Sequence, residues 1–221
     1  MKKIVLYSEK IIFKSIGSIR SKRDSIILLL ETVKYLMIYY EKIVEFSDVD
    51  VVENDDDITI VLYIDKMKRI FYCTKDKVQS LCFPFNIKLD SEDRELEIYY
   101  NYSKIDLKCI STLLSLFNNE SLNNSLELVY SLFSDESYIN SSEDYKKILE
   151  ELIHFLYMYE DGYLRFDFDD FENEDVDYHP RHHIDLFYTN SNTFKLGIKD
   201  KISLKNIIKI IDINQKCLNI N

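Results

Sequence analysis

The side chains best suited to chemistry stand in a segment that reads LRFDFD, residues 164–169. If this segment is a strand, its side chains alternate between two faces. Arg165, Asp167 and Asp169 then share one face, whereas the apolar side chains share the other and should meet the core. The polar face presents a guanidinium between carboxylates, which suits an ion-pair network, a site for an anion or a metal site.

A second polar segment follows closely and reads HPRHHID, residues 179–185. Pro180 fixes its own backbone and biases the preceding histidine to an extended conformation. A strand that starts at His183 would place His183 and Asp185 on one face. If this strand pairs antiparallel with the first segment, the two polar faces converge. The resulting cluster would titrate near neutral pH or bind a divalent ion.

Several interpretations of this cluster stay open. It can be a structural ion-pair network that fixes the strand pairing, since buried polar networks often specify structure. It can contact a ligand or partner. It can also be the catalytic site of a metal-dependent enzyme, with catalytic residues Arg165, Asp167, Asp169 and His183. In that case the cofactor is a divalent metal ion, held by Asp167, His179 and His183; otherwise no cofactor is expected.

These segments resemble a known bacterial family. The stretch LRFDFD, followed by HPRHH, TFKLGI and a closing helix, is similar to the C-terminal part of the family called domain of unknown function number 2290. The resemblance covers residues 155–212, and the matching residues are Arg165, Asp167, Asp169, His179, Pro180 and His183. His182 stands where the family has a serine, and Phe194, Lys195 and Gly197 depart from its C-R-I-P-like segment. The resemblance implies a bacterial or mobile-element origin and a site at the matching residues, but no particular activity.

Charge limits the partners of this chain. The sequence has 39 acidic and 28 basic residues, so its net charge is −11. A negative field repels phosphate backbones, which disfavours direct nucleic-acid binding and favours a protein partner, in particular a basic one. The candidate partner-binding residues are those of an acidic segment: Asp170, Glu172, Glu174 and Asp175. The 17 tyrosines also suit interaction surfaces.

Several functional classes lack their signatures. The chain has 3 glycines and no GxxxxGK[ST], GxGxxG or GxSxG motif, which disfavours nucleotide-binding loops and the nucleophile elbow of hydrolases. Its 4 cysteines form no CxxC pair, which argues against a zinc finger. No signal peptide is apparent, and charges interrupt the apolar run at 26–44. We therefore expect a cytoplasmic protein without a membrane span.

Hydrophobic periodicity predicts an α+β fold with antiparallel sheets. The expected elements are a strand at 4–7, a long N-terminal helix over 24–46, an antiparallel meander with strands at 58–64, 70–73, 83–89 and 96–102, a central helical segment over 105–133, a helix over 141–159, strands at 163–169, 183–189 and 193–198, and a last helix over 204–213. We expect a single domain, 1–221, with a candidate division into 1–136 and 137–221.

These observations favour a non-enzymatic interaction or regulatory protein, such as an accessory or inhibitor in a bacterial defence or counter-defence system. The first alternative is a metal-dependent hydrolase or nuclease that uses the Asp/His cluster. The second is an acidic mimic of nucleic acid that inhibits a nucleic-acid-binding enzyme, which would need carboxylates along one continuous face. Oligomeric state and partner identity are left open.

Overall fold

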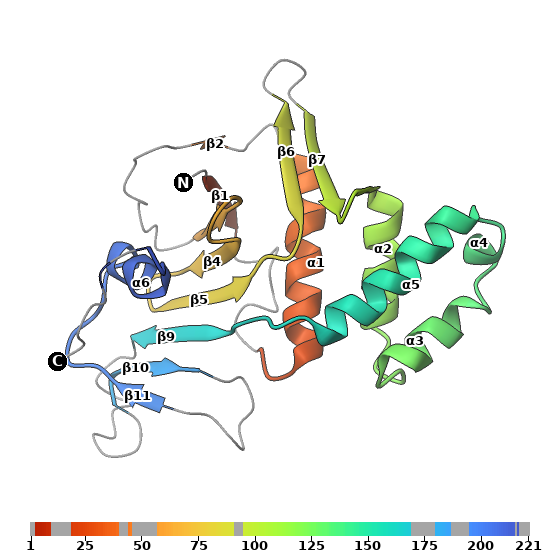
Figure 1. Cartoon of the computed structure of the whole chain (residues 1–221). Helices are drawn as coiled ribbons and strands as arrows, with labels where there is room; N and C mark the ends of the chain where they lie inside the picture. Colours follow the sequence, from red (N-terminus) through yellow and green to blue (C-terminus); the bar gives the residue numbers. More distant parts are fainter. Residues whose placement is uncertain are drawn as a thin grey trace. The chain divides into compact units, whose positions relative to one another are not determined.

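The computed structural model describes residues 3–9, 19–39, 44–45, 57–90, 95–168, 180–186, 195–214 and 216 (Figure 1). The chain forms two compact units, each built from discontinuous segments. Unit 1 comprises Met1–Ile16, Val44–Phe83 and Gly162–Asn221, and unit 2 comprises Gly17–Ile43 and Pro84–Asp161. The expected division between 136 and 137 falls inside unit 2.

Unit 1 is an antiparallel sheet in the order β11-β10-β9-β5-β4-β3-β1-β2. Its strands are β1 (Lys3–Glu9), β2 (Val44–Glu45), β3 (Asp57–Tyr63), β4 (Arg69–Cys73), β5 (Lys77–Cys82), β9 (Leu164–Phe168), β10 (His182–Asp185) and β11 (Lys195–Gly197). Strand β5 bridges the meander and the C-terminal strands, because it pairs with both β4 and β9.

Helix α6 (Leu204–Ile211) packs on one face of this sheet. Ser203 caps its first turn by accepting a hydrogen bond from a backbone N–H, a role for which serine is well suited. Its buried Leu204 and Ile207 join an apolar cluster drawn from six strands of the sheet. On the opposite face, side chains are apolar along β1, β3 and β4 and become polar from β5 to β10, which is where the candidate site lies.

The connection into β9 is held by a buried arginine of β4. Arg69 Nε donates a hydrogen bond to Ser80 Oγ at 2.8 Å, and its Nη2 donates to the carbonyl of Gly162. Gly162 has φ of +52°, a left-handed conformation that favours glycine, and a Cβ there would lie 2.9 Å from Cys82 Sγ. This contact fixes the backbone two residues before the strand that carries Arg165 and Asp167.

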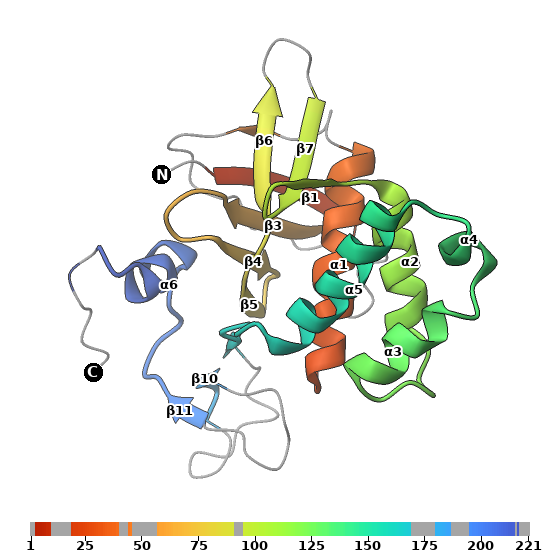
Figure 2. The same ribbon diagram turned by 45° about the vertical axis from the view of Figure 1, so that its right-hand side comes forward.

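Unit 2 combines helices with a three-stranded sheet (Figure 2). Helices α1, α2 and α5 contact one another, α3 contacts α5, and α1 contacts β7. The elements are α1 (Lys22–Tyr39), β6 (Asn86–Asp90), β7 (Glu95–Tyr100), β8 (Ser103–Ile105), α2 (Leu107–Phe117), α3 (Ser125–Leu132), α4 (Glu136–Ile139) and α5 (Glu143–Met158). None of the described helices is long and apolar enough to cross a membrane.

The α+β class, the long N-terminal helix and the C-terminal strand–strand–helix unit are confirmed. The strand expected at 83–89 is wrong in its bounds, because the structure has β5 at Lys77–Cys82 and β6 at Asn86–Asp90. Two polar residues, Gln79 and Ser80, interrupt the alternation of apolar residues in β5 and hide this strand from a periodicity argument. It is nevertheless the strand that joins the site to the meander.

Candidate functional site

Strands β5, β9 and β10 bring the predicted polar side chains together. His183 lies opposite Asp167 and Asp185 opposite Arg165 in the β9–β10 pair, while β5 places Lys77 beside Asp167. The antiparallel pairing that the sequence predicts is thus confirmed, and so is the convergence of its four residues. We call the five side chains the Arg165 cluster: Lys77, Arg165, Asp167, His183 and Asp185.

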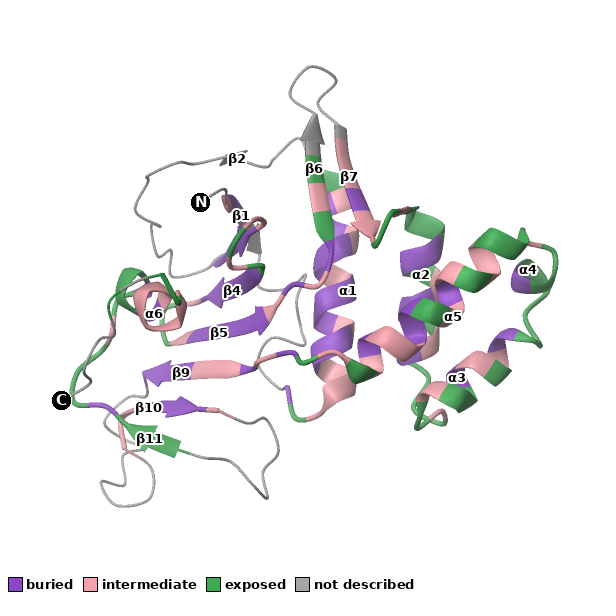
Figure 3. Cartoon of the chain, in the orientation of Figure 1, coloured by how far each residue is buried: buried purple, intermediate pink, exposed green. Residues whose placement is uncertain are grey.

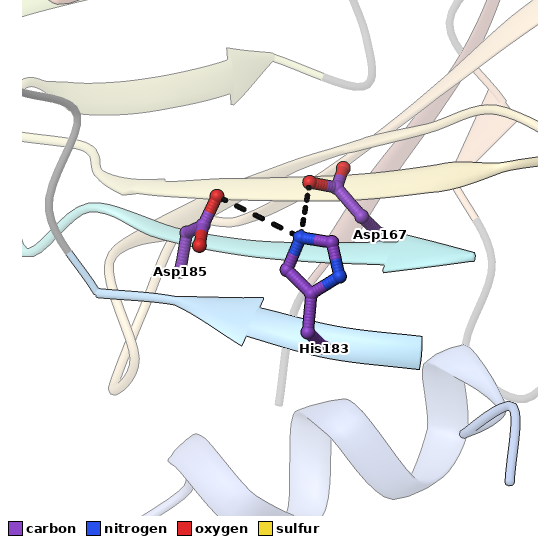
Figure 4. A group of neighbouring side chains, drawn as sticks. All are labelled: Asp167, His183 and Asp185. Atoms are coloured by element: carbon purple, nitrogen blue, oxygen red, sulfur yellow. Dashed lines mark ion pairs between the residues drawn. The ribbon is translucent and has the colours of Figure 1, made fainter. Parts of the chain in front are cut away.

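Arg165 joins the two carboxylates of this cluster. Its Nε lies 2.7 Å from Asp167 Oδ2, and its Nη2 pairs with Asp185 Oδ2. The His183 Nε2 atom lies 3.3 Å from the same Asp167 oxygen and 4.0 Å from that of Asp185 (Figure 4). Lys77 Nζ completes the network at 3.6 Å from Asp167 Oδ1. His183, Asp167 and Asp185 are buried, so these pairs are screened little by solvent.

Charges alternate across the strands of this cluster, and the alternation specifies the register. Each carboxylate has a cation beside it on the neighbouring strand and another two residues along its own strand. A slip of β10 by two residues would set Asp185 opposite Asp167 or, in the other sense, His183 opposite Arg165. Like charges opposite one another are destabilising. A slip of one residue would turn the polar face to the other side of the sheet.

Neighbouring charges shift the pKa values of the buried pair. Burial alone would raise the pKa of Asp167, but its hydrogen bond with His183 and the charges of Arg165 and Lys77 hold it below its ordinary 3.8. Burial alone would lower the pKa of His183, yet Asp167, the Pro180 carbonyl and Asp185 raise it above 6.5. The geometry therefore favours an ionised carboxylate facing an imidazolium.

The backbone sets which histidine nitrogen faces the carboxylates. His183 Nδ1 lies 2.9 Å from the carbonyl oxygen of Pro180, which accepts its N–H. The Nε2 atom is then left facing two carboxylate oxygens. A lone pair there would repel them, so a positive species must lie at this nitrogen, either a proton or a metal ion. A histidine that donates through Nδ1 to a carbonyl is also the usual arrangement of a metal ligand.

Charge balance favours the proton over the metal ion. The two carboxylates are already neutralised by Arg165 and Lys77. A protonated His183 leaves the cluster with one excess positive charge, whereas a divalent ion with neutral His183 leaves two. Arg165 also contacts the same Oδ2 atoms that lie nearest Nε2, so an ion bound there would sit beside the guanidinium. Excess buried charge is costly, and the cluster suits a proton better.

Asp167, His183 and Asp185 nevertheless offer one ligand atom each within 4.8 Å of one another. The buried Asp185 Oδ1 and the amide of Gln79, which lies opposite Arg165, have no hydrogen-bond partner among the described residues. Asp185 Oδ1 and the amide oxygen of Gln79 are therefore available as further ligands of a metal ion. Two of the three predicted metal ligands, Asp167 and His183, belong to this group, and Asp185 is the third member that the structure adds.

The other predicted residues fall outside the described part of the chain. Asp169 and His179, predicted for catalysis and metal binding, lie there. So do the four predicted partner-binding residues, Asp170, Glu172, Glu174 and Asp175.

A second feature, missed by the sequence analysis, is an exposed groove in unit 2 between α3, α4 and α5. It has a volume of about 410 Å³. Phe133 is 55% and Ile139 is 50% exposed, and Tyr130, which lies beside Phe133, is 68% exposed. Figure 3 shows exposed positions on these helices. We call it the α3–α5 groove, and its lining residues are Phe133, Tyr138, Ile139, Glu143, Lys146, Lys147 and Glu150.

Local capping explains how the groove is built from three consecutive helices. Asn124 caps α3 by accepting from the N–H of Glu127, whose carboxylate accepts from the N–H of Asn123 in return. Asp135 caps α4 and Ser142 caps α5 in the same way. Three caps within twenty residues turn the chain sharply and leave side chains such as Phe133 outside the core. The caps are a sequence signal from which these turns could have been predicted.

The first prediction concerns Arg165, which holds both carboxylates. Arg165→Met should destabilise the fold by about 3–5 kcal/mol, because it leaves two buried carboxylates without their shared cation. Urea denaturation measures the change in the free energy of unfolding. Lys147→Met is the control, since its ion pair with Glu151 is at the surface and should contribute less than about 0.5 kcal/mol. Equal losses in the two variants would contradict a structural role for Arg165.

The second prediction concerns the pH dependence of stability. Because folding raises the pKa of His183, its contribution is complete below pH 6.5 and is lost as pH rises through the folded value. Asp167 acts in the opposite sense, since its lowered pKa contributes stability above 3.8 that is lost on acidification. The free energy of unfolding should therefore fall as pH rises above about 6.5.

His183→Gln should remove this fall, and His182→Gln, on the opposite face of β10, should keep it. The charged groups that face His183 are Arg165 and Asp167 on β9, Asp185 on its own strand and Lys77 on β5. A fall of the same size in the His183 variant would show that another group is responsible.

No protein-family model, no curated protein and no solved structure matches this chain. The resemblance to domain of unknown function number 2290 stays a prediction.

Proposed function

We propose that this protein is a non-enzymatic, protein-binding regulatory component. The observation that carries the proposal is the α3–α5 groove. There, the lining residues Phe133 and Ile139 expose half or more of their surface, and the exposed ring of Tyr130 lies 6.4 Å from that of Phe133 at the edge of the groove. Single exposed apolar residues are ordinary, but a contiguous group rimmed by charge is typical of an interaction site. Aromatic residues at the centre of such a group are the usual anchors of binding energy.

The Arg165 cluster supports the same conclusion from the other unit. Each carboxylate is held by a cation, and His183 has 0% exposure. A general base must reach its substrate within hydrogen-bond distance. The charged groups of the cluster contact one another and not an open space where a substrate could bind. Their geometry therefore suits the pairing of strands better than catalysis. On this proposal, unit 1 is held together by the cluster and binding takes place on unit 2.

The test is recovery of a stoichiometric partner from source cells with a tagged chain. The wild type should co-purify with one partner, and the double variant Tyr130→Ser, Phe133→Ser should lose it. Both side chains are exposed, so the fold should survive, as circular dichroism can check. Tyr102→Ser is the matched control, because Tyr102 is fully exposed on the turn between β7 and β8. Retention of the partner by the double variant would refute binding through this groove.

The second candidate is a metal-dependent hydrolase. It is favoured by the three ligand atoms of Asp167, His183 and Asp185 and by the Nδ1 hydrogen bond of His183. In that function the metal ion would supply a water nucleophile, and Arg165 would bind an anionic substrate. The chain's own residues would hold the ion and orient the substrate.

Metal-dependent stabilisation separates the two candidates. After dialysis against a chelator, addition of zinc or manganese should leave the melting temperature of the wild type unchanged if the cluster is structural. If the site binds the metal ion, a free metal concentration of one hundred times the Kd should raise the free energy of unfolding by about 3 kcal/mol. The melting temperature should then rise by several degrees. That shift, present in the wild type and absent in Asp185→Asn, would favour the hydrolase.

A further inference from the structure

The wall of the α3–α5 groove that α5 supplies has a regular spacing. Its residues are Glu143, Lys146, Lys147 and Glu150. Successive members of this set are three, one and three residues apart, so their side chains lie on one face of α5. They form a stripe that extends over two helical turns, about 10 Å. Side chains at this spacing form the ridges between which another helix packs. The α5 wall of the groove thus has the side-chain spacing against which a second helix can pack.

The opposite wall provides apolar anchoring. Phe133 ends α3 and stacks edge-on against Tyr138 at a ring distance of 5.8 Å. Phe133 and Ile139 are each half-exposed, so the groove does not enclose the residues that line it. Sites for small molecules enclose most of their ligand. An open groove with a striped wall fits the apolar face of an amphipathic helix instead, the recurring helix-in-groove mode of recognition.

Charge identifies which kind of helix would fit. Between residues 125 and 158, the span of α3 to α5, the sequence has seven acidic residues and two lysines. Both lysines are paired within α5, Lys146 with Glu143 at 2.8 Å and Lys147 with Glu151 at 4.0 Å. Their positive charge is therefore compensated locally, and the field around the groove is negative. A second copy of this chain, with its net charge of −11, would be repelled.

We infer that the α3–α5 groove binds a basic amphipathic helix of a protein partner. Its apolar face packs against Phe133 and Ile139, and its lysines or arginines meet the carboxylates around the groove. This inference rests on the proposed function and specifies the chemistry of the partner. It also places binding on a different acidic surface from the segment that the sequence suggested.

The test uses three synthetic peptides of about 18 residues, enough for five helical turns. The first has leucine and lysine at amphipathic helical spacing, and the second replaces every lysine by glutamate. The third has the composition of the first in an order without helical periodicity. Fluorescence anisotropy of labelled peptide measures the affinity for the full chain.

The lysine peptide should bind at least tenfold more tightly than either control peptide. Phe133→Ser should weaken its binding by about tenfold or more, as expected for a central aromatic anchor. Neutralising two exposed carboxylates, with Glu136→Gln and Asp144→Asn, should weaken it about threefold, and added salt should do the same. Tyr102→Ser should leave the affinity unchanged, because this tyrosine lies outside the groove.

The outcomes separate the inference from the proposed function. Equal binding of the lysine and glutamate peptides, both lost in Phe133→Ser, would overturn the basic chemistry but keep the groove as a binding site. Binding of the lysine peptide that Phe133→Ser does not weaken would show nonspecific attraction and overturn the inference. A dimer that Phe133→Ser dissociates would make a second copy the occupant. If no peptide binds and no partner co-purifies, both proposals fail.

Discussion

The pairing of Arg165 with the carboxylates of Asp167 and Asp185 is the interaction on which the architecture of unit 1 depends. It joins β9 to β10, while Lys77 and His183 extend the same network to β5 and along β10. Strand β5 in turn connects these strands to the apolar meander. The order of the sheet at this end is therefore specified by alternating charge rather than by apolar packing alone.

Buried ion pairs are weak evidence for stability, since taking charges out of water offsets most of their attraction. Their effect here is on specificity. Short strands such as β10, with four residues, and β11, with three, bury too little apolar surface to define a register on their own. For β10, the network supplies this, because a slip of two residues sets like charges opposite one another and a slip of one turns the polar face to the other side of the sheet.

The sequence predicted this cluster because alternation in a strand needs only local information. Arg165 and Asp167 fall on one face by their spacing, and His183 and Asp185 follow from an antiparallel pairing of two nearby segments. Lys77 was not predicted, because its contact depends on β5 lying beside β9, a pairing between residues far apart in sequence. Arg69 was missed for the same reason, since its partner Gly162 stands 93 residues away.

The groove was missed for a different physical reason. The sequence predicts helices over 105–133 and 141–159, but helical periodicity alone does not show which apolar side chains near their junction are exposed. Only the capped turns between α3, α4 and α5 show that these side chains point outward. Exposure depends on how three helices meet, and this information is absent from the periodicity of any one of them.

The geometry and charge of the Arg165 cluster favour a proton over a metal ion between His183 and its carboxylates. Nitrogen-15 NMR of the histidine rings tests it most directly, with His183→Gln to assign the signal. At pH 6.5 both ring nitrogens of His183 should be mostly protonated, because its pKa lies above that value, and neither zinc nor a chelator should change the spectrum. A ring protonated only at Nδ1, with an Nε2 signal that moves when zinc is added, would contradict it.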